Sequence, residues 1–243
     1  MRPALLEPVL LIRNDRYESF GVAAPTLAWE GLDLITADMT SGAELPDIRE
    51  VSGVVAFGGT VNVNDPSRAF LADVRDYARI AVDAAVPFLG ICLGSQILAW
   101  ALGREVVRSP VRECGFEPIR PTAKGKEDRL LSQYTDGDLV LQWHEDTHEL
   151  PPEATLLATG DAIPMQAYRV GDSAWGIQFH QEVDAGEFAA WVDLASAETD
   201  LAAAWGKSAE QLRSEAGRNM ADHEERGREL FRRFAAIVRE RAR

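Results

Sequence analysis

Short apolar runs alternate with polar stretches in the first part of the chain, a pattern typical of a parallel sheet. Runs suited to buried strands occur at residues 8–12, 31–37, 51–57 and 86–91. Between the last two, apolar residues recur at helical spacing from about residue 67 to 85, which predicts an amphipathic helix. Strands that alternate with helices predict a mainly parallel sheet with helices on both faces.

The pattern changes after Gly103, where short apolar runs follow one another with little helical periodicity. Strands are expected at residues 105–108, 116–120, 139–143, 156–159, 165–170 and 173–180. Helical periodicity returns from Gly186, and residues 208–243 predict an amphipathic final helix. We therefore predict an α/β fold, a three-layer sandwich with a mixed, largely parallel central sheet, over residues 1–195. Residues 196–243 would form a helical C-terminal extension packed on this domain.

Composition narrows the class of protein. The chain has 243 residues, 46% hydrophobic and 26% charged, as in ordinary globular proteins. Its formal net charge of −14 argues against an electrostatic grip on nucleic acid or on an anionic membrane. No uncharged apolar run approaches the ~20 residues of a membrane-spanning helix, and the N-terminus lacks the apolar region of a signal peptide. Two cysteines make no disulfide framework, so we expect a cytoplasmic protein with reduced thiols.

A cysteine lies where the apolar run at 86–91 turns into a helix. Gly90, Cys92 and Gly94 follow one another at alternate positions, and helical spacing begins at Ser95. Such a turn, a nucleophile elbow, crowds the residues two before and two after the nucleophile, which gives both glycines a steric reason. It also places the thiol at a helix N-terminus, where the dipole favours the reactive thiolate. A buried structural thiol is the alternative, but the flanking glycines favour a nucleophile.

A thiol nucleophile requires a base and a group that orients the base. His180 ends an apolar strand, and Glu182 lies on the same face two residues later, where it can fix the tautomer of the imidazole. A pair that merely caps the strand end is the alternative. The backbone N–H groups of Leu93 and Gly59 are candidates for an oxyanion hole, although Gly59 also fits a plain tight turn. His223, in the charged final helix, is expected to face solvent.

Several motifs then agree with one family. The segment Gly90-Ile91-Cys92-Leu93-Gly94-Ser95-Gln96 matches the G-x-C-x-G-x-Q signature of class I, triad-type, glutamine amidotransferases. Three further motifs occur in the same order along the chain as in that family: Phe57-Gly58-Gly59, Trp143-His144-Glu145-Asp146 and the run from Gly176 to Val183. The chain thus resembles this flavodoxin-like family, and in particular stand-alone proteins similar to the glutaminase domain of GMP synthase.

The resemblance implies a reaction and a set of site residues. Cys92 would attack the side-chain amide of glutamine, and a γ-glutamyl thioester would form while ammonia leaves. His180 would transfer the protons, Glu182 would orient it, and the family oxyanion hole matches the N–H groups of Gly59 and Leu93. Positions that hold the glutamine substrate in the family match Gly58, Gln96, Glu113, Gly115 and His144. The resemblance implies no cofactor and no metal.

Two residues depart from the family pattern. Gln181 replaces the usual proline between the His and the Glu, and because it points away from the face of its neighbours, we expect little chemical effect. Cys114 replaces a residue that is commonly aliphatic in the family, within the segment 112–115 that matches positions holding the glutamine substrate.

One motif is a decoy. The sequence from His144 to His148 fits the H-E-x-x-H pattern of zinc proteases, which requires both histidines on one face of a helix. A strand-like run precedes it and Pro151-Pro152 follows almost at once, so there is no room for a stable helix. We therefore reject the zinc-site interpretation.

The sequence leaves the acceptor of the ammonia open. It contains no G-x-x-x-x-G-K-[ST] phosphate loop, so the protein would either feed ammonia to a separate synthetase or work alone. One alternative is a stand-alone γ-glutamyl peptidase or hydrolase with the same triad. A catalytically silent regulatory module is another, although the intact Cys92, His180 and Glu182 argue against it.

Overall fold

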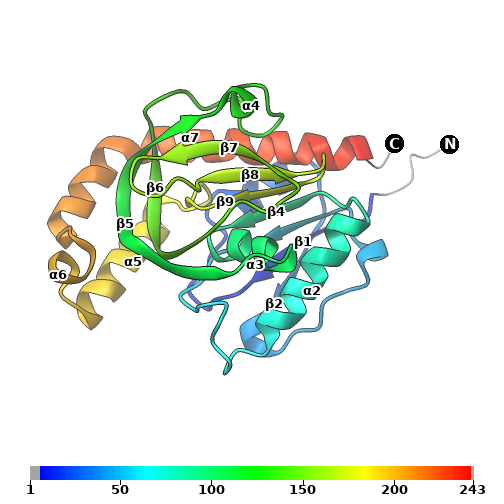
Figure 1. The fold of residues 1–243 in the computed structure, drawn as a ribbon, viewed down its shortest axis with the longest axis horizontal. Coiled ribbons are helices and arrows are strands. Elements are labelled where there is room, and N and C mark those ends of the chain that lie inside the picture. The colour runs from blue at the N-terminus through cyan, green and yellow to red at the C-terminus, as the bar shows by residue number, and fades with distance from the viewer. Residues whose placement is uncertain (1–5, 242–243) are drawn as a thin grey trace.

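A nine-stranded sheet forms the centre of the computed structural model, which describes residues 6–241 (Figure 1). The strands are β1 (Val9–Arg13), β2 (Leu34–Asp38), β3 (Gly53–Ala56), β4 (Phe88–Ile91), β5 (Val106–Pro121), β6 (Asp138–His148), β7 (Ala154–Gly160), β8 (Ala167–Val170) and β9 (Ala174–Ile177). Their order in the sheet is β2-β1-β3-β4-β9-β8-β7-β5-β6. In this order, the strands from β2 through β1, β3 and β4 to β9 pair in parallel with their neighbours. The strands from β9 through β8, β7 and β5 to β6 pair antiparallel. The predicted α/β fold with a mixed sheet is confirmed.

Helices cover both faces of the sheet and complete a three-layer sandwich. They are α1 (Ala23–Trp29), α2 (Phe70–Asp83), α3 (Leu93–Ala101), α4 (Ala123–Lys126), α5 (Ala185–Glu198), α6 (Leu201–Trp205), α7 (Ala209–Arg241) and the 3₁₀ helices η1 (Met39–Ser41) and η2 (Ile48–Glu50). Figure 1 shows α2 and α3 in front of the sheet and α7 behind it. The side chains of β1 alternate accordingly. Val9 and Leu11 join a core cluster with α1 and α7, whereas Leu10 and Ile12 join one with α2 and α3.

Two of the predicted strands are joined in the structure. The expected strands at 105–108 and 116–120 are parts of one long strand, β5, which pairs with β6 along nearly its whole length. A register shift between Arg108 and Glu113 interrupts the ladder, and this stretch contains Pro110 and the polar residues Ser109 and Arg112. The apolar pattern that marks a strand is therefore lost at the irregularity, although the chain stays extended.

The long helix α7 is a layer of the sandwich. Its residues Leu230, Phe231 and Phe234 are fully buried and share one core cluster with Val9 and Leu11 of β1. The boundary predicted after residue 195 falls inside α5. Among residues 6–241, no helix has both the length and the apolar character that a bilayer crossing requires.

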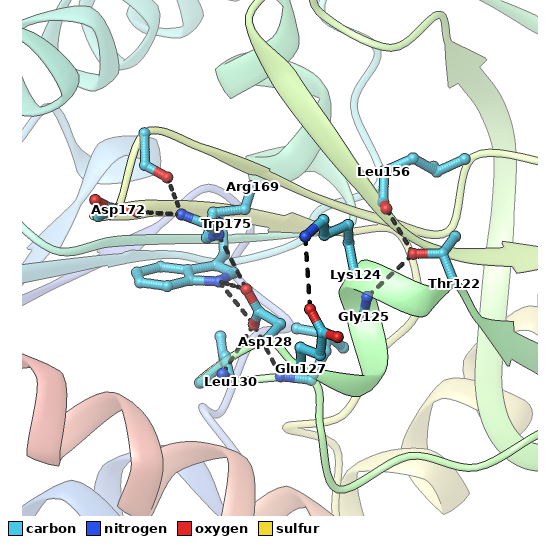
Figure 2. A network of polar contacts seen from close by, with 12 residues as sticks. Thr122, Lys124, Gly125, Glu127, Asp128, Leu130, Leu156, Arg169, Asp172 and Trp175 are labelled. Atoms are coloured by element: carbon cyan, nitrogen blue, oxygen red, sulfur yellow. Dashed lines mark hydrogen bonds and ion pairs between the residues drawn. The ribbon is translucent and has the colours of Figure 1, made fainter.

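A buried carboxylate fixes the strand that leads to the predicted catalytic histidine (Figure 2). Asp128 accepts hydrogen bonds from the indole N–H of Trp175 in β9, at 3.1 Å, and from the backbone N–H of Leu130, at 2.8 Å. The guanidinium of Arg169 in β8 lies 3.0 Å from the same carboxylate. The connection after α4 is thereby tied to β8 and β9, and β9 precedes the residues of the site.

Candidate active site

Cys92 occupies a strained position between β4 and α3. Its φ of +49° and ψ of −108° lie in a region that side-chain-bearing residues rarely adopt. A Cβ added at Gly90 would lie 2.4 Å from the carbonyl oxygen of Gly94, and one at Gly94 would lie 2.0 Å from that of Ala56. Only glycine fits at these two positions, so the turn between strand and helix depends on both of them. The thiol is held at the first turn of α3, as expected of an elbow.

The imidazole of His180 and the carboxylate of Glu182 form a short hydrogen bond. Nδ1 of His180 lies 2.7 Å from Oε1 of Glu182, and both side chains are buried. The backbone N–H of His180 donates to the carbonyl of Leu141 in β6, which fixes the segment that follows β9. Nδ1 is thereby engaged with Glu182, and the side-chain amide of Gln178 donates to Sγ of Cys92 at 3.6 Å.

The electrostatics of this pair favour a proton on the imidazole. Burial alone would lower the pKa of His180, but the charge of Glu182 and the nearby Cys92 raise it well above its usual value. An imidazole in this setting can accept a proton from the thiol and hold it.

Two further carboxyl groups lie near Glu182, and sequence reasoning missed both. Glu18 follows β1, and Glu187 lies in the first turn of α5. Burial, together with the charges of Glu182 and Glu187, raises the pKa of Glu18 well above its usual value. Burial likewise raises the pKa of Glu187 to about 7. No periodic or motif signal connects these positions, because loops and helix ends far apart in the chain bring them together.

A cavity of about 290 Å³ opens beside the cysteine. Cys92 and His180 line it together with Gly59 and Leu93, the two predicted oxyanion-hole residues. Gly58 lies beneath the imidazole, since a Cβ there would come 2.8 Å from Cε1 of His180. The structure thus gathers the predicted nucleophile, the predicted base and both candidate oxyanion donors around one space of the size that a small molecule needs.

The predicted substrate-binding residues are divided between two places. Gln96 and His144 line the cavity. Glu113 lies behind His144, with its carboxylate 2.9 Å from Nε2 of that imidazole, and does not line the cavity. Gly115 lies against α7, where an added Cβ would meet Glu215 at 2.4 Å. A contact of Gln96 or His144 with substrate stays a prediction, and the position of Gly115 does not favour one.

The H-E-x-x-H motif lies in a strand. His144 and His148 both belong to β6, so the segment is not helical, as the sequence predicts. Burial lowers the pKa of His148, and its Nδ1 lies 2.9 Å from the carbonyl of Glu149. Within residues 6–241, no group of three or more His, Cys, Asp or Glu side chains is arranged to hold a metal ion.

His223 does not face solvent, and that prediction is wrong. The side chain is 1% exposed, with Nε2 lying 3.1 Å from the carbonyl of Val183. Burial lowers its pKa to about 3, so the imidazole is neutral at ordinary pH. Gln181 ties this part of α7 to the domain. Its amide donates to the carbonyl of His223 at 2.7 Å and accepts from the hydroxyl of Tyr134 at 2.8 Å. Gln181 therefore holds the segment that carries the imidazole and its carboxylate against α7.

The second cysteine lies in a different setting. Cys114 is buried in an apolar cluster between β5, β6 and the C-terminal helices. Burial raises the pKa of this thiol to about 12, so it stays protonated and unreactive.

Three tryptophans complete the cavity, and the sequence analysis did not single them out. Trp143 comes from β6, Trp191 from α5 and Trp205 from α6, and all three line the cavity. The indole of Trp191 packs edge-on against the imidazole of His180, with ring centroids 4.9 Å apart. Their spacing in the sequence follows no single period, so only the fold reveals that they form one wall.

Comparison with known proteins gives consistent results. Residues 32–193 match the model of the class I glutamine amidotransferase family. The glutamine amidotransferase-like protein YfeJ of Salmonella typhimurium is 33% identical over 68% of this chain and 73% of its own length. The glutamine-hydrolysing GMP synthase of Porphyromonas gingivalis is 32% identical over 56% of this chain, but the match spans only 26% of that synthase.

Solved structures agree over almost the whole chain. A glutamine amidotransferase from Thermotoga maritima superimposes with a TM-score of 0.84 at 28% identity, covering 94% of this chain and 97% of that one. One from Methylobacillus flagellatus gives a TM-score of 0.87 at 27% identity, covering 94% of each chain. With the family match and the similarity to YfeJ, these results show that the chain belongs to the class I glutamine amidotransferase family.

Proposed function

We propose that this protein hydrolyses the side-chain amide of a γ-glutamyl substrate, with glutamine as the simplest case. Cys92 is the nucleophile, His180 the proton carrier and Glu182 the group that orients the imidazole. The observation that carries the proposal is their arrangement, a strained cysteine and a carboxylate-bound imidazole on one cavity.

The steps follow the chemistry of these groups. The thiolate of Cys92 attacks the γ-carbonyl carbon after its proton has passed to His180. The N–H groups of Gly59 and Leu93 stabilise the negative oxygen of the tetrahedral intermediate. His180 then gives its proton to the amide nitrogen, the C–N bond breaks, ammonia leaves and a γ-glutamyl thioester remains. Water, deprotonated by His180, attacks the thioester, which releases glutamate and restores the thiol.

When glutamine is the substrate, we propose that the ammonia released passes to a synthetase. The GMP synthases that resemble this chain are glutamine-hydrolysing by name, and the matched part is about a quarter of their length. A partner that supplies the synthetase activity would complete such a reaction.

The experiment compares the two cysteines of the chain. Cys92→Ala should lower the rate of glutamate release from glutamine by about a thousandfold or more, because no other thiol lines the cavity. Cys114→Ala is the matched control and should keep the wild-type rate. Mass spectrometry of the quenched wild-type enzyme should detect a γ-glutamyl adduct on the peptide that contains Cys92. Wild-type turnover by Cys92→Ala would refute the proposal.

A further inference from the structure

The geometry of the base indicates where the leaving amine must lie. His180 gives its proton to the amide nitrogen, so the amine part of the substrate lies on the His180 side of the cavity. On that side stands Trp191, which packs on the imidazole with ring centroids 4.9 Å apart. Ammonia is too small to require any such wall, whereas a larger amine would contact it.

The wall beside His180 is aromatic. The ring of Trp143 lies 6.0 Å from that of Trp191 and 5.9 Å from that of Trp205, and each indole is partly exposed. Trp205 also lies beyond residues 32–193, the part that matches the family model. This part of the wall is therefore better suited to selecting a substrate than to the chemistry that the family shares.

Acidic side chains predominate in the cavity. Among the described residues 6–241, its lining contains five carboxyl side chains and no Lys or Arg, with His180 as the basic group at its catalytic end. Some of them are engaged: Glu145 pairs with Arg112 at 2.8 Å, and Asp146 accepts a hydrogen bond from Asn62 at 2.6 Å. Glu198, at the end of α5, is exposed and forms no ion pair or side-chain hydrogen bond with the described residues 6–241. Its negative charge is therefore available to a ligand at the tryptophan wall.

A cation already lies against one of these rings. The guanidinium carbon of Arg112 lies 5.2 Å from the ring centroid of Trp205, and the same guanidinium donates to the carbonyl of Ala204 at 2.6 Å. This contact holds α6 over the cavity. It also illustrates the attraction of the indole for a positive charge, which is strongest for tryptophan among the aromatic side chains.

We propose that the preferred substrate is a γ-glutamyl amide of a cationic amine, such as a diamine, with its distal ammonium group between the tryptophan wall and Glu198. The inference rests on the proposed function, because it assigns the substrate of the same triad. Hydrolysis breaks the γ-amide C–N bond, consumes one water and yields glutamate and the free amine, with no other reactant. The indole faces and the carboxylate attract the ammonium, whereas a carboxylate on the amine would be repelled.

Four purified substrates test the proposal on the wild-type protein. They are glutamine and the γ-glutamyl amides of putrescine, pentylamine and γ-aminobutyrate, which place a positive, a neutral and a negative group at similar reach. We expect kcat/KM for the putrescine amide to exceed that for the pentylamine amide by about fivefold or more, with the γ-aminobutyrate amide lowest. Highest activity on glutamine, or equal activity on the three amides, would overturn the substrate assignment while leaving the triad mechanism intact. Absence of glutamate release from all four would instead refute the proposed function.

Variants locate the effect. Glu198→Gln should reduce the putrescine-to-pentylamine ratio of kcat/KM about threefold or more. Trp205→Leu should lower kcat/KM for both larger amides more than for glutamine. Glu153→Gln removes an equal charge from an exposed site outside the cavity lining, and should leave the ratio at its wild-type value. An unchanged ratio in Glu198→Gln would overturn the assigned position of the ammonium group.

Discussion

The buried carboxyl group of Glu187 makes the stability of the protein depend on pH in a predictable direction. Its Oε1 accepts a hydrogen bond from the backbone N–H of Ser19 at 2.8 Å, and its Oε2 is buried with no hydrogen-bond partner among the described residues 6–241. Burial raises its pKa from 4.5 to about 7, with a contribution from the charge of Glu182. Between these two values the folded protein keeps a proton that the unfolded chain has released. Stability is therefore lost as the pH rises through this window.

The magnitude follows from the shift. One pKa unit corresponds to about 1.4 kcal/mol, so the full rise is worth about 3 kcal/mol above the window. Glu187→Gln keeps the shape and the acceptor oxygen but does not titrate. The free energy of unfolding of Glu187→Gln minus that of wild type should therefore be about 2 kcal/mol larger at about pH 8.5 than at about pH 5, which means that the variant is relatively more stable at the higher pH. A pH-independent cost of the buried amide cancels in this difference.

Urea unfolding at the two pH values measures the effect. Val192→Ala, at a buried and non-titrating position on the same helix, is the control, and it should lose the same stability at both pH values. If Glu187→Gln changed the free energy of unfolding equally at both pH values, the carboxyl group would not be protonated in the folded state, and the reasoning would be refuted.

Three other predictions concern the elbow, the final helix and the sheet. Gly94→Ala would place a Cβ 2.0 Å from the carbonyl oxygen of Ala56. We therefore expect the free energy of unfolding in urea to fall by about 3 kcal/mol or more, with loss of glutaminase activity. Gly217→Ala, at a helical position with open space around it, is the control and should stabilise the protein by about 0.5–1 kcal/mol. Between about pH 7 and pH 5, the free energy of unfolding should fall by about 2 kcal/mol less for His223→Gln than for wild type, because the pKa of the buried imidazole is about 3 when folded and 6.5 when unfolded. Unfolding curves of both proteins at the two pH values measure this difference, and an equal fall in both proteins would contradict the prediction. Asp128→Ala leaves the buried indole N–H of Trp175 without an acceptor and removes one of the two carboxylates beside Arg169, so thermal or urea unfolding should show a loss of about 3 kcal/mol; a loss below about 1 kcal/mol would mean that the carboxylate is dispensable.

Local patterns predicted the elements that local sequence determines. The apolar runs that became β1, β3 and β4 are buried on both faces, so their composition alone marks them as inner strands. The elbow was equally readable, because its geometry requires glycine at two fixed distances from Cys92. The rejection of a helix for the H-E-x-x-H segment was correct for a similar reason, because the flanking residues exclude one.

Features that depend on tertiary packing were out of reach of the sequence. The helical pattern of α7 was visible, but its polar residues concealed that it forms a core layer, and His223 was misplaced as a result. Glu18 and Glu187 lie far apart in the chain and meet only through the fold. The same is true of the tryptophan wall, whose members come from β6, α5 and α6. No local signal distinguishes such residues from ordinary surface or core positions.

The sharing of one core cluster by β1 and α7 has a consequence for biosynthesis. Val9 and Leu11 are synthesised about 220 residues before Leu230 and Phe231, which share their core cluster. Contacts so distant in sequence form slowly, because a long loop must close first. A nascent chain with its parallel strands already paired would therefore carry an uncovered apolar face until α7 has been synthesised. During that interval the exposed apolar face makes the growing polypeptide prone to aggregation.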